Sequence, residues 1–451
     1  MRTSRLLAGA TILSVGTIFA GVANAVIPAR TASLPNQSVT SFQPTVANDR
    51  GIRLGSIGSG LFRTRTDAPH EFYMVTDRGP NGQPDEKRTF PVPDFDPTIV
   101  KVRVRGEQIQ ILERIPLRTT SGAPVTGLSN FSAVTSPLSP TAPAPDEIPY
   151  NFDGSAILGT YNENGLDTED IVRTSTGQFW IVDEYRPSVL KVASNGVVLA
   201  RYVPEGLLDE FSSVDYPVYD TLPPQYAYRR VNRGFEGLAI SPDETSLFVA
   251  LQSPLQLPPT TTVGRDSRNT RILRLDTNGH VTGEFVYRFD LASSFDPTPG
   301  TRARDMKVSG LYAISDTNVL VLERTDFVAK VYLVDLASAT DIGTWTSPSA
   351  NLNHLESLDA DGTLETAGIT PVTKTLVINL ETIDGMPDKI ESITMVNPSV
   401  LAVANDNDFG LTDNPTWNGN GNLMSDTGTL SKILYVTLPS ALPLGPVKKG
   451  H

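Results

Sequence analysis

The sequence predicts an all-β protein of the β-propeller class. Short apolar runs recur between turn signals, and Gly and Pro are frequent, with 35 of each. Few segments keep the apolar period of a helix. The runs fall into repeating groups of four, and a four-stranded unit is the blade of a propeller. Five units are visible, and six blades are expected because one segment of the chain has no place in them.

The repeat is clearest in the stretch 168–187. The acidic pair Glu169-Asp170 opens an apolar segment, a Gly-containing turn follows, and a second apolar run ends on Asp183-Glu184. Two strands joined by a tight turn run antiparallel, so the start of the first and the end of the second lie at one edge. The two acidic pairs are therefore predicted to meet.

The remaining strands follow in the same order. The first unit is predicted at 58–62, 72–77, 98–104 and 108–117. The second continues from its opening pair through 188–192 and 197–203. The third is predicted at 235–240, 247–252, 271–275 and 281–289, and the fourth at 309–312, 319–324, 329–334 and 341–345. The fifth has only 390–393, 400–405 and 432–438, so the N-terminal segment is expected to close the ring.

Four segments do not fit the repeat. The polar segment 346–373, with the apolar run 374–380, is interpreted as part of a sixth blade or as an excursion between blades. Three further stretches are rich in Pro, Ser and Thr, and we expect them to be surface excursions over the functional face: 119–149, 204–230 and 253–269.

The first 25 residues resemble a secretory signal. Arg2 and Arg5 precede the apolar and small-residue run 6–22, and Ala23-Asn24-Ala25 is typical of a cleavage site. A membrane anchor is the alternative, although the run is short and is interrupted by Gly, Ser and Thr. A secreted or periplasmic protein is expected. The predicted segments are a signal peptide at 1–25, an N-terminal extension at 26–50, a propeller domain at 51–438 and a C-terminal tail at 439–451.

Charge and composition exclude several classes of function. The formal net charge is −13, which argues against a partner such as nucleic acid or an anionic membrane. The chain has no Cys and therefore neither disulfides nor thiolate metal ligands. We expect a monomer whose mature chain does not insert into a membrane and whose stability comes from a large core.

The radial arrangement of blades gathers acidic residues on one face, where the inner strands begin and the second strands end. Acids so close together repel each other unless cations neutralise them, and Ca²⁺ prefers carboxylate, amide and carbonyl oxygens. Ca²⁺ is therefore the expected cofactor. Its predicted ligands are Asp77, Glu169, Asp170, Glu391, Asn405, Asp406 and Asp408.

The alternative is that these acids are structural. Each could cap a turn or pair with one of four arginines near the motifs, namely Arg78, Arg186, Arg233 and Arg324. Other chemistry has little support. The chain lacks a G-x-S-x-G nucleophile motif, and none of its four His lies in a repeated motif.

Four motifs of the chain resemble a known family. They are Asp167-Thr-Glu-Asp-Ile-Val172, Phe179-Trp-Ile-Val-Asp-Glu-Tyr-Arg-Pro187, Asn232-Arg-Gly-Phe-Glu-Gly-Leu-Ala239 and Ala404-Asn-Asp-Asn-Asp-Phe409. Together they are similar to the phytase-like family described as having esterase-like activity of phytase, over about 51–438. This resemblance implies an exported protein with a propeller-like fold and a role in phosphoric ester hydrolysis. In one departure, Glu391 is followed by Ser where Glu236 is followed by Gly.

Two functional hypotheses follow. The first is a Ca²⁺-assisted hydrolase of a small anionic substrate such as a phosphate ester. In it Asp183, Glu184 and Glu236 are catalytic, a metal-activated water attacks, and Arg78 and Arg186 orient the phosphate. The rival is a non-catalytic propeller that binds a ligand or partner, with the acids structural. The fold alone does not decide between them.

Overall fold

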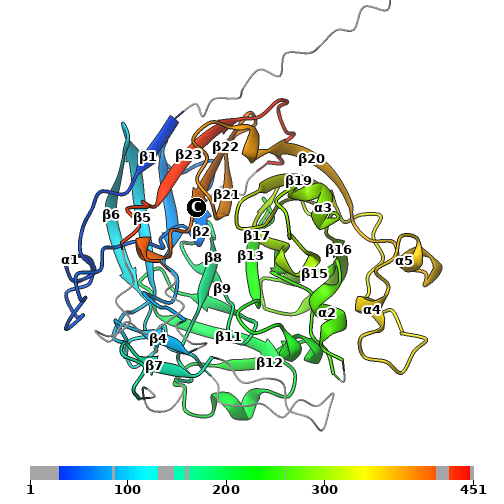
Figure 1. Cartoon of the computed structure of the whole chain (residues 1–451), viewed down its shortest axis with the longest axis horizontal. Helices are drawn as coiled ribbons and strands as arrows, with labels where there is room; N and C mark the ends of the chain where they lie inside the picture. The colour runs from blue at the N-terminus through cyan, green and yellow to red at the C-terminus, as the bar shows by residue number, and fades with distance from the viewer. Residues whose placement is uncertain are drawn as a thin grey trace, which may run out of the picture.

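The computed structural model describes residues 30–83, 87–130, 147–156, 158, 162–258, 260–412 and 426–446. These residues form four-stranded antiparallel units arranged around a central axis (Figure 1). The signal peptide expected at 1–25 lies outside the described residues.

The first four units follow the chain, each with its inner strand first. The first contains β2 (Gly60–Phe62), β3 (Glu71–Val75), β5 (Thr98–Arg105) and β6 (Gln108–Pro116). The second contains β8 (Thr168–Arg173), β9 (Phe179–Asp183), β10 (Ser188–Val192) and β11 (Val198–Pro204), and β12 (Val218–Leu222) joins its outer edge. The third contains β13 (Phe235–Ile240), β14 (Ser246–Leu251), β15 (Asn269–Asp276) and β16 (Val281–Arg288). The fourth contains β17 (Lys307–Ala313), β18 (Asn318–Arg324), β19 (Ala329–Asp335) and β20 (Thr373–Asn379).

The fifth unit combines the two ends of the described chain. It contains β21 (Ile390–Asn397), β22 (Val400–Asn405), β23 (Lys432–Thr437) and β1 (Arg30–Ser33). β1 pairs antiparallel with β23, with Ala32 opposite Ile433. The expected closure by the N-terminal segment is therefore confirmed. The described part of the 26–50 extension belongs to the propeller.

The number of blades differs from the prediction. Within the described residues there are five blades and not six. The inner strands contact one another in the order β2, β8, β13, β17, β21, and β21 contacts β2, so the ring is already closed. The fold class itself, a β-propeller with an all-β core, is confirmed.

The error arises in the fourth blade. The predicted strand 341–345 is a turn, because the Asp341 carboxylate accepts hydrogen bonds from the backbone N–H groups of Gly343 and Glu284, each at 3.0 Å. The true fourth strand is β20, which pairs antiparallel with β19. Residues 336–372 are thus an excursion, and 374–380 belongs to a visible blade rather than to a sixth.

Short elements lie in the connections between strands. The helices are α1 (Val39–Phe42), α2 (Thr262–Asp266), α3 (Ala292–Phe295), α4 (His354–Ser357) and α5 (Thr363–Thr366). The 3₁₀ turns are η2 (Leu208–Phe211), η3 (Pro224–Tyr228), η4 (Ala303–Asp305), η5 (Leu380–Thr382) and η6 (Asp408–Gly410). A small parallel pair is formed by β4 (Arg88–Phe90) and β7 (Pro149–Asn151).

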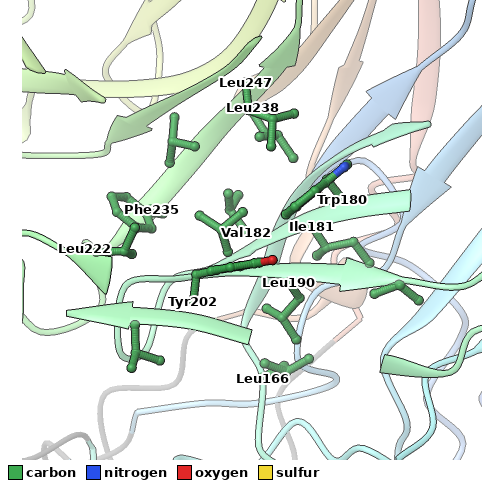
Figure 2. Packing of buried hydrophobic residues seen from close by; sticks show 14 of the residues in the cluster. Leu166, Trp180, Ile181, Val182, Leu190, Tyr202, Leu222, Phe235, Leu238 and Leu247 are labelled. Atoms are coloured by element: carbon green, nitrogen blue, oxygen red, sulfur yellow. The ribbon is translucent and has the colours of Figure 1, made fainter. Parts of the chain in front are cut away.

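The core lies between the blades. Side chains of alternate strand residues fill the space between adjacent sheets, and the largest cluster joins the first three blades. Figure 2 shows Val182 and Tyr202 of the second blade beside Phe235 and Leu238 of the third. Burial of each such side chain stabilises the fold by about 1.5–3 kcal/mol. Packing between adjacent blades therefore holds the blades in place around the axis.

Candidate functional site

A β-bulge recurs near the start of four of the inner strands. The register against the second strand shifts at Glu169-Asp170 in β8, at Glu236 in β13, at Ser309-Gly310 in β17 and at Glu391 in β21. A bulge inserts one extra residue and re-aims the neighbouring side chains. The bulges therefore occur at the repeated opening position that the sequence predicted, which is acidic in β8, β13 and β21.

Five acids meet at the axis, on the face where the inner strands begin. Asp77, Asp167 and Glu169 offer carboxylate oxygens within 4.8 Å of one another. Glu169, Glu184 and Glu236 do the same, so Glu169 belongs to both groups. These five residues are called the acidic centre below. They come from the first three blades. Four of them were predicted on this face from the sequence, and Asp167 was not among them.

Arg78 is the main counter-charge of the acidic centre. Its Nη1 lies 2.9 Å from Asp167 Oδ2 and 3.2 Å from Glu147 Oε2. Its Nη2 donates to Asn232 Oδ1 at 2.5 Å. The Arg78 guanidinium is thus held by three partners. Its single positive charge cannot balance the five carboxylates of the acidic centre.

Four oxygens of the acidic centre are buried without a hydrogen-bond partner among the described residues, although one of them, Asp167 Oδ2, forms the ion pair with Arg78. They are Asp167 Oδ1, Asp167 Oδ2, Glu184 Oε1 and Glu236 Oε2. Burial, aided by the charge of Glu236, raises the pKa of Glu184 to about 8. Burial raises the pKa of Asp167 to about 7 against the opposing effect of Arg78. Burial also raises the pKa of Glu169, and the neighbouring acids add to the shift. Orphaned buried carboxylates of this kind suit a bound cation.

Asp183 lies outside the acidic centre. It is 0% exposed and forms an ion pair with Arg201, which is also 0% exposed. Its Oδ1 accepts from the backbone N–H groups of Asp167 at 2.9 Å and Tyr185 at 3.2 Å. Its Oδ2 accepts from Ser188 Oγ at 3.1 Å and from Asn130 Nδ2 at 3.3 Å. No lone pair of Asp183 remains for a cation or a substrate.

Asp170 joins two inner strands near the axis through backbone hydrogen bonds. Its Oδ2 accepts from the backbone N–H of Leu238 at 2.8 Å, and its Oδ1 from that of Ile171 at 2.8 Å. Burial raises its pKa. Asp170 thus links the inner strands of the second and third blades, and it does not belong to either carboxylate group.

Glu391 and Glu236 both lie beside the guanidinium of Arg324, which connects the third, fourth and fifth blades. Arg324 pairs with Glu391 and lies 3.7 Å from Glu236 Oε1. Its Nε also donates to Ser309 Oγ at 2.7 Å. Burial raises the pKa of Glu391 to about 8 despite Arg324. Glu391 therefore adjoins the acidic centre through Arg324.

The Asn405–Asp408 segment stabilises the loop after β22. Asn405 Oδ1 accepts from the backbone N–H of Lys432 at 2.7 Å, and Asp406 Oδ1 accepts from Ser56 Oγ at 2.5 Å. Lys389 Nζ donates to Asp406 at 3.2 Å and to Asp408 at 2.6 Å. Two of these predicted metal ligands, Asp406 and Asp408, are brought together around Lys389, whereas Asn405 binds the backbone of β23.

The remaining predicted residue, Arg186, is 0% exposed. Its positive charge acts on Glu210 of the second excursion. A different arginine, Arg233, faces the acidic centre from the third blade: burial lowers its pKa to about 10, and Glu184 is among the charges that act on it.

The family described as phytase-like, with esterase-like activity of phytase, matches residues 52–409, which is more than half of the chain. The chain belongs to the phytase-like family. The resemblance predicted from four sequence motifs is thereby confirmed.

A relative of this phytase-like chain is known from sequence. An uncharacterized secreted protein of Arthroderma benhamiae is 28% identical over 297 residues, which cover 59% of this chain. The match spans 56% of the length of that relative. Separately, within the described residues, helices long and apolar enough to cross a membrane are absent.

Solved structures similar to the phytase-like chain include propellers of unrelated sequence. Regucalcin from Agrobacterium tumefaciens, a calcium-binding protein, is 9% identical over 87% of this chain and 94% of its own, with a TM-score of 0.33. The propeller domain of Cps50 from Myceliophteria thermophila is 10% identical over 84% and 97%, with a TM-score of 0.31. At these values the similarity carries no argument about function.

Two residues of the candidate site were missed by the sequence argument. Asp167 stands one position before the predicted strand, and its carbonyl accepts from the backbone N–H of Glu184 at 2.9 Å. Extending the antiparallel pairing by one residue would have placed it there. Glu147 ends the first excursion and reaches Arg78 and Arg88, and the repeat contains no signal for it.

Proposed function

We propose that this phytase-like protein is an exported, Ca²⁺-assisted hydrolase of phosphate esters whose reaction takes place at the acidic centre. The observation that carries the proposal is the pair of carboxylate groups joined by Glu169, with four buried oxygens that lack hydrogen-bond partners among the described residues. Secretion of the Arthroderma relative supports export. The family's description supports ester hydrolysis.

The residues of the centre fit a hard cation. Asp77, Asp167, Glu169, Glu184 and Glu236 offer only carboxylate oxygens, which are the ligands that Ca²⁺ prefers. When bound, Ca²⁺ supplies a positive charge that polarises a phosphoryl oxygen and lowers the pKa of water. It would also allow several adjacent acids to be ionised together, which their mutual repulsion otherwise opposes.

Two arginines would have different tasks. Arg78 is already held by Asp167, Glu147 and Asn232, so it would position Asp167 rather than grip a substrate. Arg233 has a single hydrogen bond to a side chain in the described part of the chain, from its Nη1 to Ser253 Oγ at 3.4 Å. We assign Arg233 the role of orienting the phosphate, in place of the predicted Arg78 and Arg186.

The test combines melting and turnover. Melting of the purified protein and hydrolysis of a generic phosphomonoester and of phytate are measured with Ca²⁺ and after chelation. Ca²⁺ is expected to raise the melting temperature and to be required for turnover, and Glu169→Gln should abolish both effects. Glu113→Gln, at an exposed position on β6, is the matched control and should change neither.

The rival is a binding module whose cation is structural. It is favoured by the many acids that are paired within the blades, of which Asp183 with Arg201 is the clearest. A rise in melting temperature with Ca²⁺, without turnover of any phosphate ester, would establish this rival. If Ca²⁺ changes neither melting nor turnover, the cation site itself is disproved.

A further inference from the structure

A hollow lies at the end of the propeller axis opposite to the acidic centre, where the inner strands end. Its volume is about 120 Å³. Every inner strand contributes at least one apolar residue to its wall, and one from each strand is Leu61, Ile171, Leu238, Leu311 and Ile393. A cavity of about 150 Å³ in another protein, lined by similar residues, binds a benzene ring. This hollow, the distal cavity, therefore has room for an apolar body of about one ring.

The distal cavity is separated from the acidic centre by close packing of the backbone. A Cβ added at Gly60 would lie 2.9 Å from the backbone nitrogen of Ile171, and one at Gly237 would lie 2.6 Å from the carbonyl oxygen of Ser309. At this level Asp170 also accepts the backbone N–H of Leu238. The axis is thus closed in its middle, and the two ends are independent.

The rim of the distal cavity is basic. Arg63, Arg65 and Arg173 line it together with one acid, Glu244. The Glu244 carboxylate already accepts from the backbone N–H of Ser175 at 2.6 Å and from its hydroxyl at 2.9 Å. An excess of positive charge therefore faces the cavity.

Arg63 is the decisive side chain. It is 5% exposed, and its Nη1 donates to the carbonyl of Val396 at 2.8 Å, while its Nη2 donates to the carbonyl of Asp67 at 3.3 Å. Its Nε is buried without a hydrogen-bond partner among the described residues, as is Nε of Arg65. A buried guanidinium that donates to two neutral carbonyls is suited to an oxyanion, which would supply both charge and acceptors.

We propose that the distal cavity binds a small organic anion, with its oxyanion head at Arg63 and Arg65 and its apolar body against the five inner-strand residues. The head is a carboxylate or a phosphate-type group, because the arginine fork matches both. The inference does not depend on hydrolysis at the acidic centre.

The test is isothermal titration of the purified protein with benzoate and with phenylphosphonate, which is not hydrolysed. Benzamide serves as the uncharged analogue. Saturable binding of at least one anion is expected, and little binding of benzamide. Binding of benzoate alone assigns a carboxylate ligand, and binding of phenylphosphonate alone assigns a phosphate-type ligand.

Variants locate the binding. Arg63→Gln should weaken the affinity about tenfold or more, because hydrogen bonds to a charged group are lost. Ala313→Leu should do the same by filling the cavity, since Ala313 is buried in its wall. Arg274→Gln, at an arginine outside the cavity, and Glu169→Gln should leave the affinity unchanged.

Three results would overturn the proposal. They are the absence of saturable binding by both anions, equal binding of benzamide, and unchanged affinity in a folded Arg63→Gln variant. If Arg63→Gln does not fold, Ala313→Leu decides alone, because it leaves every charge in place.

Discussion

At the scale of single residues, adjacent acids on one strand have opposite roles. Asp183 and Glu184 are neighbours at the end of β9, and successive side chains of a strand point to opposite faces. Asp183 turns into the blade and pairs with Arg201, whereas Glu184 turns to the axis and joins the acidic centre. The same acidic pair therefore contributes one structural residue and one candidate ligand.

Asp183→Asn is expected to lower stability rather than to remove the cation site. Loss of one partner of a buried ion pair leaves Arg201 uncompensated and costs about 3–5 kcal/mol of unfolding free energy. The measurement is denaturant unfolding of the variant beside Asp209→Asn, at an exposed aspartate of η2. The folded fraction should keep its rise in melting temperature with Ca²⁺. A variant of wild-type stability that no longer responds to Ca²⁺ would contradict this assignment.

At the scale of elements, the strands of the blades could be predicted, and the site in part. Period-2 patterning and turn residues located the inner strands, and the antiparallel rule brought Glu169 and Glu184 together. The bulges could not be foreseen, because they depend on how the inner strands pack around the axis. Without them, Asp170 and Glu169 could not be distinguished. The sixth blade was wrong because β20 pairs with β19 across a long excursion.

The N-terminal strand offers a test of ring closure. Ala32 of β1 is buried opposite Ile433, while its neighbour Thr31 is only partly buried. Ala32→Asp places an unpaired carboxylate in the core between β1 and its neighbours, and should lower the unfolding free energy by about 3 kcal/mol or more. Thr31→Asp is the control for the altered charge, and its effect should be small. Equal melting temperatures of the two variants would show that β1 does not close the ring in solution.

At the scale of the whole molecule, the closed ring concentrates like charges that a larger opening would spread apart. Five inner strands leave little room at the axis, as the close approach at Gly60 and Gly237 shows. Acids from the first three blades therefore share one desolvated volume. The raised pKa values of Asp167, Glu169 and Glu184 are the electrostatic consequence. Binding of a cation and binding of protons must compete there.

This competition predicts how stability depends on pH. Without Ca²⁺, Asp167 and Glu184 keep protons in the folded chain up to pKa values of about 7 and about 8, whereas the unfolded chain releases them near the ordinary values of 3.8 and 4.5. The folded state then binds more protons, so the contribution of these groups to stability is full below about pH 4 and is lost as the pH rises through 7 and 8.

Ca²⁺ should reverse the trend, because it requires the ionised carboxylates. The rise in melting temperature on adding Ca²⁺ is expected to be small at pH 5 and larger at pH 8, and binding at pH 7 should release protons. Melting curves across this range, with and without Ca²⁺, measure the effect, and Glu169→Gln should remove it. An equal Ca²⁺ response at pH 5 and pH 8 would mean that the cation binds elsewhere, at carboxylates that are already ionised in acid. The segment Asn405–Asp408 would then be the first alternative, since the pKa of Asp406 is lowered, although burial opposes this, by Lys389 and by the Ser56 hydroxyl.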